Sequence, residues 1–331
     1  MPRSRTICSA PPAPPSADRG RVGAGEQPRP PVSGSPPMRK SIPSGGRRLW
    51  SVALRGTLGT LLLLAGSGWA PAQDFKVQTR IFDARSSSAT EKKDRRATPV
   101  GRSTALFHAG KVYDSLDAGN QLTIFEPAQK RFVLLDGSRR IATYVTFDEL
   151  ETLLYQAEKR AEEQLLKLKG TARSSDAQLA SHLKFQLQPV FQESFDDAKQ
   201  QLKLSGAALN YTVRCAPADP VEVVDIYLNY ADWAKKLDYL VNAQAPLPAP
   251  RLKVNDALRE RKRLPVEVQL TTHQAGGLRL TAEHNFTWTL DQHDRKTIRH
   301  WEDLLHSKSV KPVSREEFFT RPALVSARDK R

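Results

Sequence analysis

The chain has 331 residues, enough for two average domains, and its 51 Lys and Arg against 36 Asp and Glu give a formal charge of +15. The charge is uneven, because residues 1–72 hold ten basic and two acidic groups, whereas residues 73–331 hold 41 basic and 34 acidic groups in a mixed order. Such mixing is typical of an ordinary solvated surface, so we expect no nucleic-acid partner.

The first 37 residues do not resemble folded protein. They contain ten of the 23 prolines, with Gly, Ser and Arg between them and almost no apolar periodicity. A stretch of this composition cannot bury enough apolar surface to offset the entropy of ordering. We expect residues 1–37 to be disordered or to be a mis-called start, with translation beginning at or near Met38.

Residues 38–72 have the order of a secretory signal peptide. Basic residues up to Arg55 precede an apolar run over 61–64, and small residues end at Ala72. The apolar run is too short to anchor the chain across about 30 Å of hydrocarbon, and no later run reaches about 18 apolar residues. We therefore expect cleavage after Ala72, export to the periplasm or the extracellular space, and a mature chain without a transmembrane anchor.

Strand signals open the mature chain. Alternating apolar and polar residues predict a half-buried strand over 75–81, followed by a charged, Ser-rich loop over 85–96. Five short apolar runs with tight turns between them then predict a meander of antiparallel strands. The five runs are 103–107, 111–116, 121–126, 131–136 and 141–145.

Two strands of this meander are apolar on both faces. In the strand over 131–136, Phe132 and Leu134 point one way, and Val133 and Leu135 point the other. A strand with two dry faces needs cover on each side. One cover is predicted by the helical spacing of leucines and alanines over 147–169, which indicates a long amphipathic helix.

The second half of the mature chain mixes helices and strands. Its predicted elements are a short helix that passes into an extended segment over 174–187, strands over 191–195, 201–205 and 209–215, and helices over 223–241 and 254–263. A hairpin follows, with strands over 266–270 and 278–290 joined by a turn over 274–277. The last helix is capped by Asp291 and buries Ile298, Trp301 and Leu305, and a basic flexible tail follows over 307–331. We expect one α+β domain over 73–306.

No catalytic or metal-binding motif is present. His293, His300 and His306 are seven and six residues apart, which does not bring them together as helical metal ligands. Cys215 has no partner after loss of the signal peptide and is expected to be a small core residue. We expect no cofactor, no metal and no catalytic residue, with one alternative: a hydrolase whose acid pair comes from Glu193 and the Asp196-Asp197 pair.

A resemblance concerns the strands around Phe107-His108-Ala109-Gly110-Lys111-Val112-Tyr113 and Thr123-Ile124-Phe125-Glu126-Pro127. Their rhythm resembles periplasmic lipoprotein-carrier-like sheets, and the chain is similar to an uncharacterised family of exported proteins from planctomycete-type bacteria. The resemblance covers most of residues 74–305. It implies a curved antiparallel sheet, an incomplete barrel, that is packed against amphipathic helices and holds acyl chains.

These patterns together predict an exported, non-catalytic envelope protein of the α+β class that binds or carries an apolar, lipid-like ligand between its sheet and helices. The residues expected to line the ligand are Phe125, Phe132, His284, Phe286 and Trp288. His284 is included because it interrupts an otherwise apolar strand face, although a core histidine is the simpler interpretation. Two alternatives stay open: a structural or protein-interaction module of the envelope with a protein partner and no ligand, and the hydrolase described above.

Overall fold

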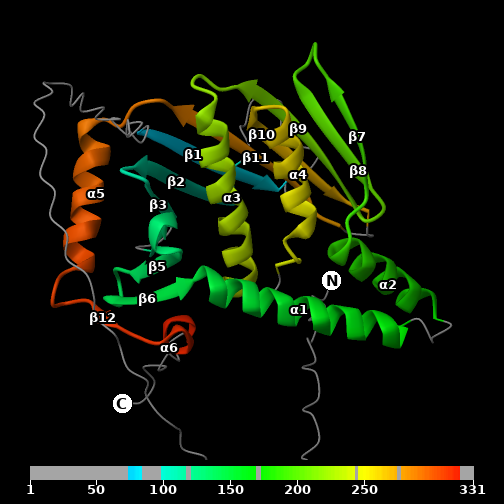
Figure 1. Ribbon diagram of the computed structural model, residues 1–331, viewed down its shortest axis with the longest axis horizontal. Helices are drawn as coiled ribbons and strands as arrows, with labels where there is room; N and C mark the ends of the chain where they lie inside the picture. Colours follow the sequence, from blue (N-terminus) through cyan, green and yellow to red (C-terminus); the bar gives the residue numbers. More distant parts are fainter. Residues whose placement is uncertain are drawn as a thin grey trace, which may run out of the picture. The chain divides into compact units, whose positions relative to one another are not determined.

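One twelve-stranded sheet organises the part of the chain that the computed structural model describes, which is residues 74–83, 98–116, 121–168, 173–242, 245–273 and 277–320. The expected disordered start, the signal peptide, the loop over 85–96 and most of the 274–277 turn lie outside these residues. All described residues belong to one compact unit. Figure 1 shows helices packed against this sheet.

The bounds of the elements follow the chain. The strands are β1 (Phe75–Asp83), β2 (Gly101–His108), β3 (Lys111–Leu116), β4 (Gln121–Glu126), β5 (Arg131–Asp136), β6 (Ile141–Thr146), β7 (Phe191–Asp196), β8 (Gln201–Gly206), β9 (Leu209–Pro217), β10 (Arg263–Thr272), β11 (Arg279–Thr287) and β12 (Lys311–Pro312). The helices are α1 (Phe147–Leu168), α2 (Ser174–Leu187), α3 (Glu222–Val241), α4 (Ala249–Glu260), α5 (Gln292–Leu305) and α6 (Arg315–Phe319), with a 3₁₀ turn η1 (Pro127–Gln129).

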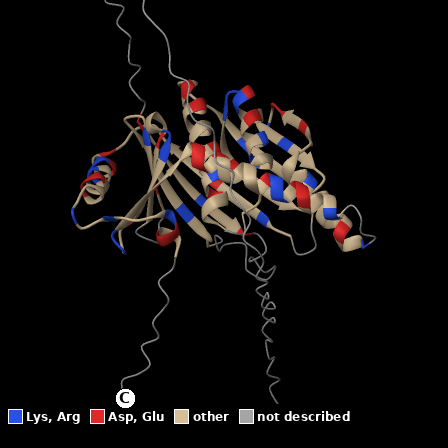
Figure 2. Cartoon of the chain, turned by 60° about the horizontal axis from the view of Figure 1, so that its bottom comes forward, with Lys and Arg blue, Asp and Glu red and all other residues tan. Residues whose placement is uncertain are grey.

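The sheet consists of two antiparallel meanders joined by β1. Its strand order is β12-β6-β5-β4-β3-β2-β1-β11-β10-β9-β8-β7, and the described strands are antiparallel to their neighbours except for the parallel pair of β12 and β6. Short connections explain why β2 to β6, β7 to β9, and β10 and β11 are antiparallel neighbours, whereas β9 and β10 pair although α3 and α4 lie between them in the chain. The sheet is curved and open, and the predicted α+β class with amphipathic helices against an antiparallel sheet is confirmed (Figure 2).

Helices cover the two faces of the sheet unequally. On the inner face, Phe75, Phe107, Phe125 and Phe132 pack in one cluster with the buried residues of α1, α3 and α4. On the outer face, a second cluster lies under α5 and joins Ile298 to the strands β2 to β6. Its other buried members are Leu106, Tyr113, Leu122, Ile124, Val133, Leu135, Ala142 and Leu290. The second cover required by the two-faced strands is therefore α5.

Most predicted elements are confirmed with small shifts at their ends, but four predictions were wrong. The strand after the hairpin turn has nine residues and ends at Thr287. It was expected to run to Leu290, but Leu290 packs in the outer cluster whereas Phe286 packs against the inner one. The chain must therefore leave the sheet between these two residues.

Two helices also differ from expectation. The helix α2 continues to Leu187, because Leu183 and Leu187, four residues apart, pack on the same side against Ala157 and Leu247. The helix α4 begins at Ala249, five residues earlier than predicted. Its proline at the first turn is compatible with a helix start, where the missing N–H has no intrahelical acceptor.

Residues 307–320 do not form the predicted flexible tail. The backbone N–H of Lys311 donates to Arg140 O over 2.9 Å, and that of Val313 donates to Ala142 O over 2.9 Å, so this segment adds β12 to the sheet. In α6, Phe318 is buried and contacts the inner cluster. A two-residue strand and a single helical turn are too short to show hydrophobic periodicity, so that pattern does not reveal them. The rest of the predicted tail, 321–331, lies outside the described residues.

Candidate functional site

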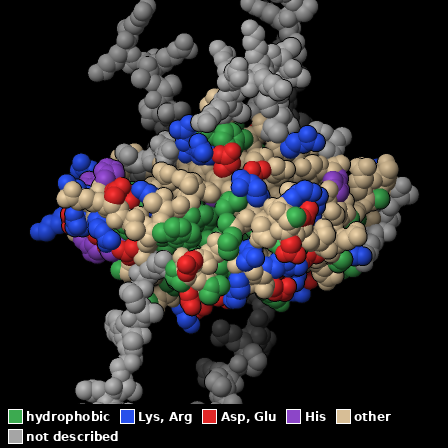
Figure 3. Space-filling view, turned by 90° about the horizontal axis from the view of Figure 1, so that it is seen from above, with side chains coloured by type: hydrophobic (Ala, Val, Ile, Leu, Met, Phe, Trp, Pro, Cys, Tyr) green, Lys and Arg blue, Asp and Glu red, His purple; other side chains and the backbone are tan. Residues whose placement is uncertain are grey.

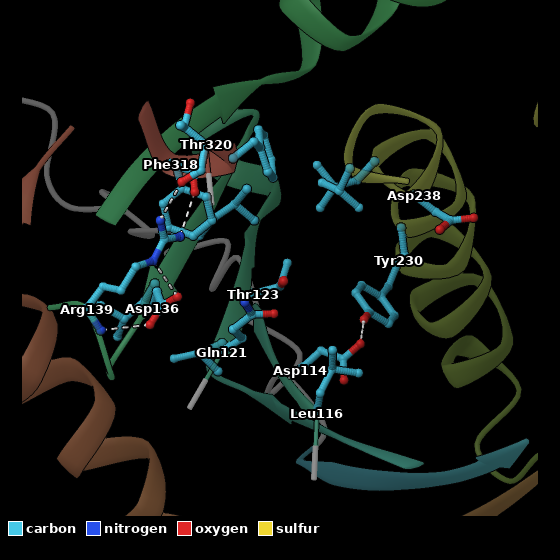
Figure 4. A pocket seen from close by; sticks show the side chains of 17 residues that line it. Asp114, Leu116, Gln121, Thr123, Asp136, Arg139, Tyr230, Asp238, Phe318 and Thr320 are labelled. Atoms are coloured by element: carbon cyan, nitrogen blue, oxygen red, sulfur yellow. Dashed lines mark hydrogen bonds and ion pairs between the residues drawn. The ribbon is translucent and has the colours of Figure 1, made fainter. Parts of the chain in front are cut away.

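A cavity of about 590 Å³ lies on the inner face, between the C-terminal half of α3 and the strands β3 to β5 (Figure 4). The helix α6 closes one side of it. This volume lies within the range of about 300–1,000 Å³ that is usual for small-molecule sites. The lining residues are Asp114, Leu116, Gln121, Leu122, Thr123, Leu134, Leu135, Asp136, Arg139, Tyr230, Ala234, Leu237, Asp238, Val241, Phe318, Phe319 and Thr320.

The helix α3 supplies the apolar wall because of its residue spacing. Tyr230, Ala234, Leu237 and Val241 are four, three and four residues apart, so they follow one another along one face of the helix. The first part of this face is buried in the inner cluster, and the last part borders the cavity. Val241 is 44 % exposed. The face that builds the core thus continues beyond it into the cavity wall.

The rim of the cavity is apolar as well. Leu116 from β3 and Phe319 from α6 are 52 % and 37 % exposed, and both line the cavity together with Val241. Large apolar side chains that share one opening are a usual feature of sites that bind an apolar partner. A ligand that enters here would remove these side chains from water.

Asp114 is the most unusual polar group of the cavity. Its Oδ2 accepts a hydrogen bond of 2.5 Å from the Tyr230 hydroxyl, and its buried Oδ1 has no hydrogen-bond partner among the described residues. Burial raises the pKa of Asp114 to about 6, although the Tyr230 and Ser103 side chains favour the ionised form. Burial and the neighbouring Asp114 raise the pKa of Tyr230 well above its ordinary value, so the phenol keeps its proton.

Arg139 fixes the other end of the cavity. Its Nε donates to Asp136 Oδ2 over 2.9 Å, and its Nη2 and Nη1 donate to the carbonyl oxygens of Phe318 and Thr320 over 2.6 Å and 3.3 Å. Burial acts to raise the pKa of Asp136, but hydrogen bonds and charge from Arg139 outweigh it and lower this pKa. The guanidinium thereby holds the C-terminal segment, including α6, against the sheet.

None of the five predicted lining residues borders this cavity. Phe125 and Phe132 are buried and pack against Phe147, with ring centroids 5.6 Å and 5.9 Å away. Both are core residues of the inner face. Their alternation with outward-facing neighbours was predicted correctly, but the helices α1 and α3 fill the space beside them.

The other three predicted residues lie on or just beyond β11. The Nδ1 of His284 lies 3.0 Å from Thr79 Oγ1, and burial, with a smaller effect of the Arg251 charge, lowers its pKa to about 3. His284 is therefore a neutral core histidine at neutral pH. Phe286 is half-buried and packs against Tyr227, with ring centroids 5.1 Å apart.

Trp288, the last of the residues expected to line the ligand, is 39 % exposed. It stacks on Phe286 at the margin of the inner cluster, with ring centroids 5.7 Å apart. Figure 3, which views the upper side of Figure 1, shows apolar side chains gathered between charged groups on that face. A residue beyond the end of a strand loses the cover that the helices give to the sheet.

Glu193 and Asp196, two of the three acids of the hydrolase alternative, do not form an acid pair. Glu193 is ion-paired with Arg261, and Asp196 accepts from the backbone and side chain of Lys199 over 3.0 Å and 3.1 Å. Because Glu193 and Asp196 are three residues apart in one strand, their side chains point to opposite faces of the sheet. They cannot act on one substrate atom from there.

The described residues contain neither a metal site nor a membrane-spanning helix. No group of three or more His, Cys, Asp or Glu is placed to hold a metal ion. Within the same residues, no helix combines the length and the apolar character needed to cross a bilayer. Cys215 is buried and free, as predicted from its lack of a partner.

Sequence reasoning missed Asp114, Tyr230, Arg139 and α6 as parts of a site. One signal was present: Asp114 is a lone acid on the inward-facing side of β3, opposite Ala105 and Thr123 on the neighbouring strands. No protein-family model and no curated protein matches the chain. The resemblance to lipoprotein-carrier-like sheets and to exported planctomycete-type proteins therefore stays a prediction, and the site is argued from its own geometry.

Proposed function

We propose that the protein is a non-catalytic binding protein that takes up an apolar, lipid-like molecule in the cavity between α3, α6 and the strands β3 to β5. The observation that supports this function is the cavity of about 590 Å³, whose lining combines apolar side chains from α3, α6 and the strands with polar groups. Binding sites for small molecules usually have this composition, with apolar walls for affinity and isolated polar groups for orientation.

The packing of the sheet gives a second reason to expect a ligand at this place. The inner cluster is continuous along β2 to β5, but next to the C-terminal half of α3 the cavity interrupts it. Protein interiors are close-packed, so an unfilled apolar volume loses dispersion contacts on every side. A bound alkyl chain would restore these contacts and cover the exposed rim.

Displacement of a neutral fluorescent probe, N-phenyl-1-naphthylamine, tests this function on the purified full chain. We expect the probe to bind and to be displaced by dodecanol. The substitution Ala234→Trp should fill the cavity and weaken probe binding about tenfold or more, since each factor of ten corresponds to about 1.4 kcal/mol. Leu166→Trp, at a 67 % exposed position of α1 outside the cavity, is the control and should bind as the natural chain does.

Two results would reject the binding function. In the first, the natural chain binds no apolar probe. In the second, Ala234→Trp binds the probe as well as Leu166→Trp does. Either result would leave the structural or protein-interaction module as the remaining function, and a stable envelope partner would then be sought.

We also propose that the protein acts outside the cytoplasm. The support is the order of basic, apolar and small residues over 38–72. Intact mass of the protein from the envelope fraction should give an N-terminus at residue 73 or 74. A chain that retains residues 38–72 in that fraction would contradict export by signal cleavage.

A further inference from the structure

We propose that the ligand carries a hydrogen-bond donor, an amino or hydroxyl group, and that this group binds to the Asp114 carboxylate. The proposal rests on the proposed function and specifies the class of ligand: an alkylamine or a long-chain alcohol is accepted, whereas a fatty acid is not.

The charges that line the cavity provide the first argument. Three acids border it, and two of them already have cationic partners: Asp136 with Arg139 at 2.9 Å, and Asp238 with Lys235 at 2.7 Å. Asp114 forms no ion pair with any cation of the described residues, and the groups that favour its ionised form are the neutral Tyr230 hydroxyl and Ser103 side chain. The free charge of the cavity is therefore negative.

The same comparison argues against a ligand carboxylate. Arg139 is the one cationic side chain among the lining residues, and it is already bound to Asp136 and to two backbone carbonyl oxygens. A carboxylate in the cavity would have to compete with these contacts and would lie near the unpaired Asp114. Like charges in a partly dry site repel each other strongly.

The hydrogen bonds of Asp114 provide the second argument. A carboxylate can accept several hydrogen bonds, and one of its oxygens, Oδ1, accepts none here. The terminal torsion of an aspartate side chain has a broad energy minimum, so the carboxylate can turn this oxygen toward a group that enters from the cavity. A donor on the ligand would satisfy a buried acceptor that otherwise costs free energy.

Among the described residues, the groups that face Asp114 from neighbouring elements are neutral. They are Ser103 on β2, Thr123 on β4, and Tyr227 and Tyr230 on α3. The nearest charged groups on the cavity wall are the paired Asp136 and Arg139 and the paired Asp238. Since burial raises the pKa of Asp114 to about 6, the carboxylate is ionised and accepts hydrogen bonds above this pH, and it gains a proton below it.

Displacement of N-phenyl-1-naphthylamine by three twelve-carbon compounds tests the proposal. Dodecylamine, dodecanol and dodecanoate are compared on the full chain at pH 7.5, below the concentrations at which they form micelles. We expect dodecylamine and dodecanol to displace the probe and dodecanoate to be at least about tenfold weaker than dodecylamine. When the pH is lowered from 7.5 to 5, the affinity for dodecylamine should fall while that for dodecanol changes less.

The substitution Asp114→Asn should weaken dodecylamine binding by about tenfold or more, because a charge-assisted hydrogen bond is lost. Asp225→Asn is the matched control: it makes the same change on α3 at an exposed acid that pairs with Lys262 and does not line the cavity. If Asp114→Asn does not fold, the pH series on the natural chain provides the decisive measurement.

The possible failures are distinguishable. Equal binding of all three compounds, with no effect of pH or of Asp114→Asn, would overturn the proposal, although the cavity would still be a binding site if Ala234→Trp blocked the probe. Tighter binding of dodecanoate than of dodecylamine would overturn it as well. A chain that binds neither the probe nor any of the three compounds would reject the proposed function itself.

Discussion

The two meanders of the sheet share one inner core but differ on their outer faces. In the meander β2 to β6, the outer side chains Leu106, Tyr113, Ile124 and Val133 are buried under α5. In the meander β7 to β11, the corresponding cross-strand row is polar and lacks such a cluster, for example Lys203, Thr212, Gln269 and Thr281. The half formed by β2 to β6 therefore has both faces buried, whereas the half formed by β7 to β11 has only its inner face buried.

The difference shows that one sheet can have an outer face that is apolar and covered in one half and polar and exposed to water in the other. An apolar outer face needs a covering helix, and α5 is tied to its half of the sheet by more than apolar contact. The Tyr113 hydroxyl donates to Glu302 over 2.5 Å, and Lys111 bridges Glu302 and Glu126 over 3.1 Å and 2.8 Å. A polar outer face needs no cover, because water satisfies its side chains.

The largest loss of stability should come from truncating a buried side chain on the outer face of β2 to β6. Ile124 is fully buried, so Ile124→Ala should lower the free energy of unfolding by about 2–5 kcal/mol through lost burial and a residual cavity. Gln269→Ala, at an exposed outer position of the other meander, should stay within about 0.5 kcal/mol of the natural chain. Denaturant unfolding measures both, and similar losses at the two positions would refute the division of the sheet into unlike halves.

A buried acid in the doubly covered half should cost stability as the pH rises. Because the pKa of Asp114 is raised from 3.8 to about 6 in the folded protein, the folded chain holds this proton more tightly than the unfolded chain does. Stability therefore falls between about pH 4 and pH 6, by up to about 3 kcal/mol. Asp114→Asn should remove this fall, which unfolding measurements from pH 4 to pH 7.5 would reveal.

Asp136 should have the opposite effect on the pH dependence of stability. Its pKa is lowered by Arg139, so its contribution to stability is present at neutral pH and is lost as the pH falls through the lowered pKa. Asp136→Asn should be less stable than the natural chain at pH 7, and the difference should shrink in acid. If the stability of Asp114→Asn and that of Asp136→Asn changed with pH in the same way, the opposite pKa shifts of the two carboxylates would be contradicted.

Substitutions in and next to β11, near the junction between the two meanders, should lower the free energy of unfolding by less than Ile124→Ala does. Phe286 on β11 is half-buried, so Phe286→Ala should cost about 2 kcal/mol, below the 3–5 kcal/mol usual for a fully buried phenylalanine. Trp288→Ala should cost about 1 kcal/mol, since 39 % of the residue is exposed. Both variants should bind N-phenyl-1-naphthylamine normally, and weaker binding would place the ligand beside β11 instead of in the α3 cavity.

The smallest effect should come from the ion pairs on the two outer faces. Glu302→Gln removes the carboxylate that Tyr113 and Lys111 share under α5 and should cost about 1 kcal/mol. Glu283→Gln removes a pair with Arg80 on the uncovered face, where both side chains are about half exposed, and should cost about 0–0.5 kcal/mol. Thermal unfolding of the two variants gives the comparison, and a larger loss for Glu283→Gln would contradict it.

The strands that were easiest to predict are those with strong alternation. The meander from β2 to β6 was predictable because apolar runs and tight turns are local features. The need for a second cover could also be inferred, since Val133 and Leu135 point away from Phe132 and Leu134. Nothing local indicated that α5, more than 150 residues further along the chain, would provide it.

The cavity was harder to predict, because it depends on residues that meet only after folding. The hydrogen bond of Tyr230 to Asp114 joins residues 116 positions apart, and that of Arg139 to Phe318 joins residues 179 positions apart. The interpretation of Phe125 and Phe132 as ligand-lining residues assumed too little cover on the inner face. Side-chain volume from α1 and α3, which no periodicity reveals, fills that space.

By itself, the sequence determined most of the strand and helix segments and which face of each is apolar. These properties follow from the period of the side chains along each segment. Only the tertiary structure decided which helix covers which face, where packing stops short of filling the core, and how residues 307–320 join the sheet. Those outcomes depend on how volumes from distant segments fit together, and close packing is a property of the assembled side chains rather than of any one segment.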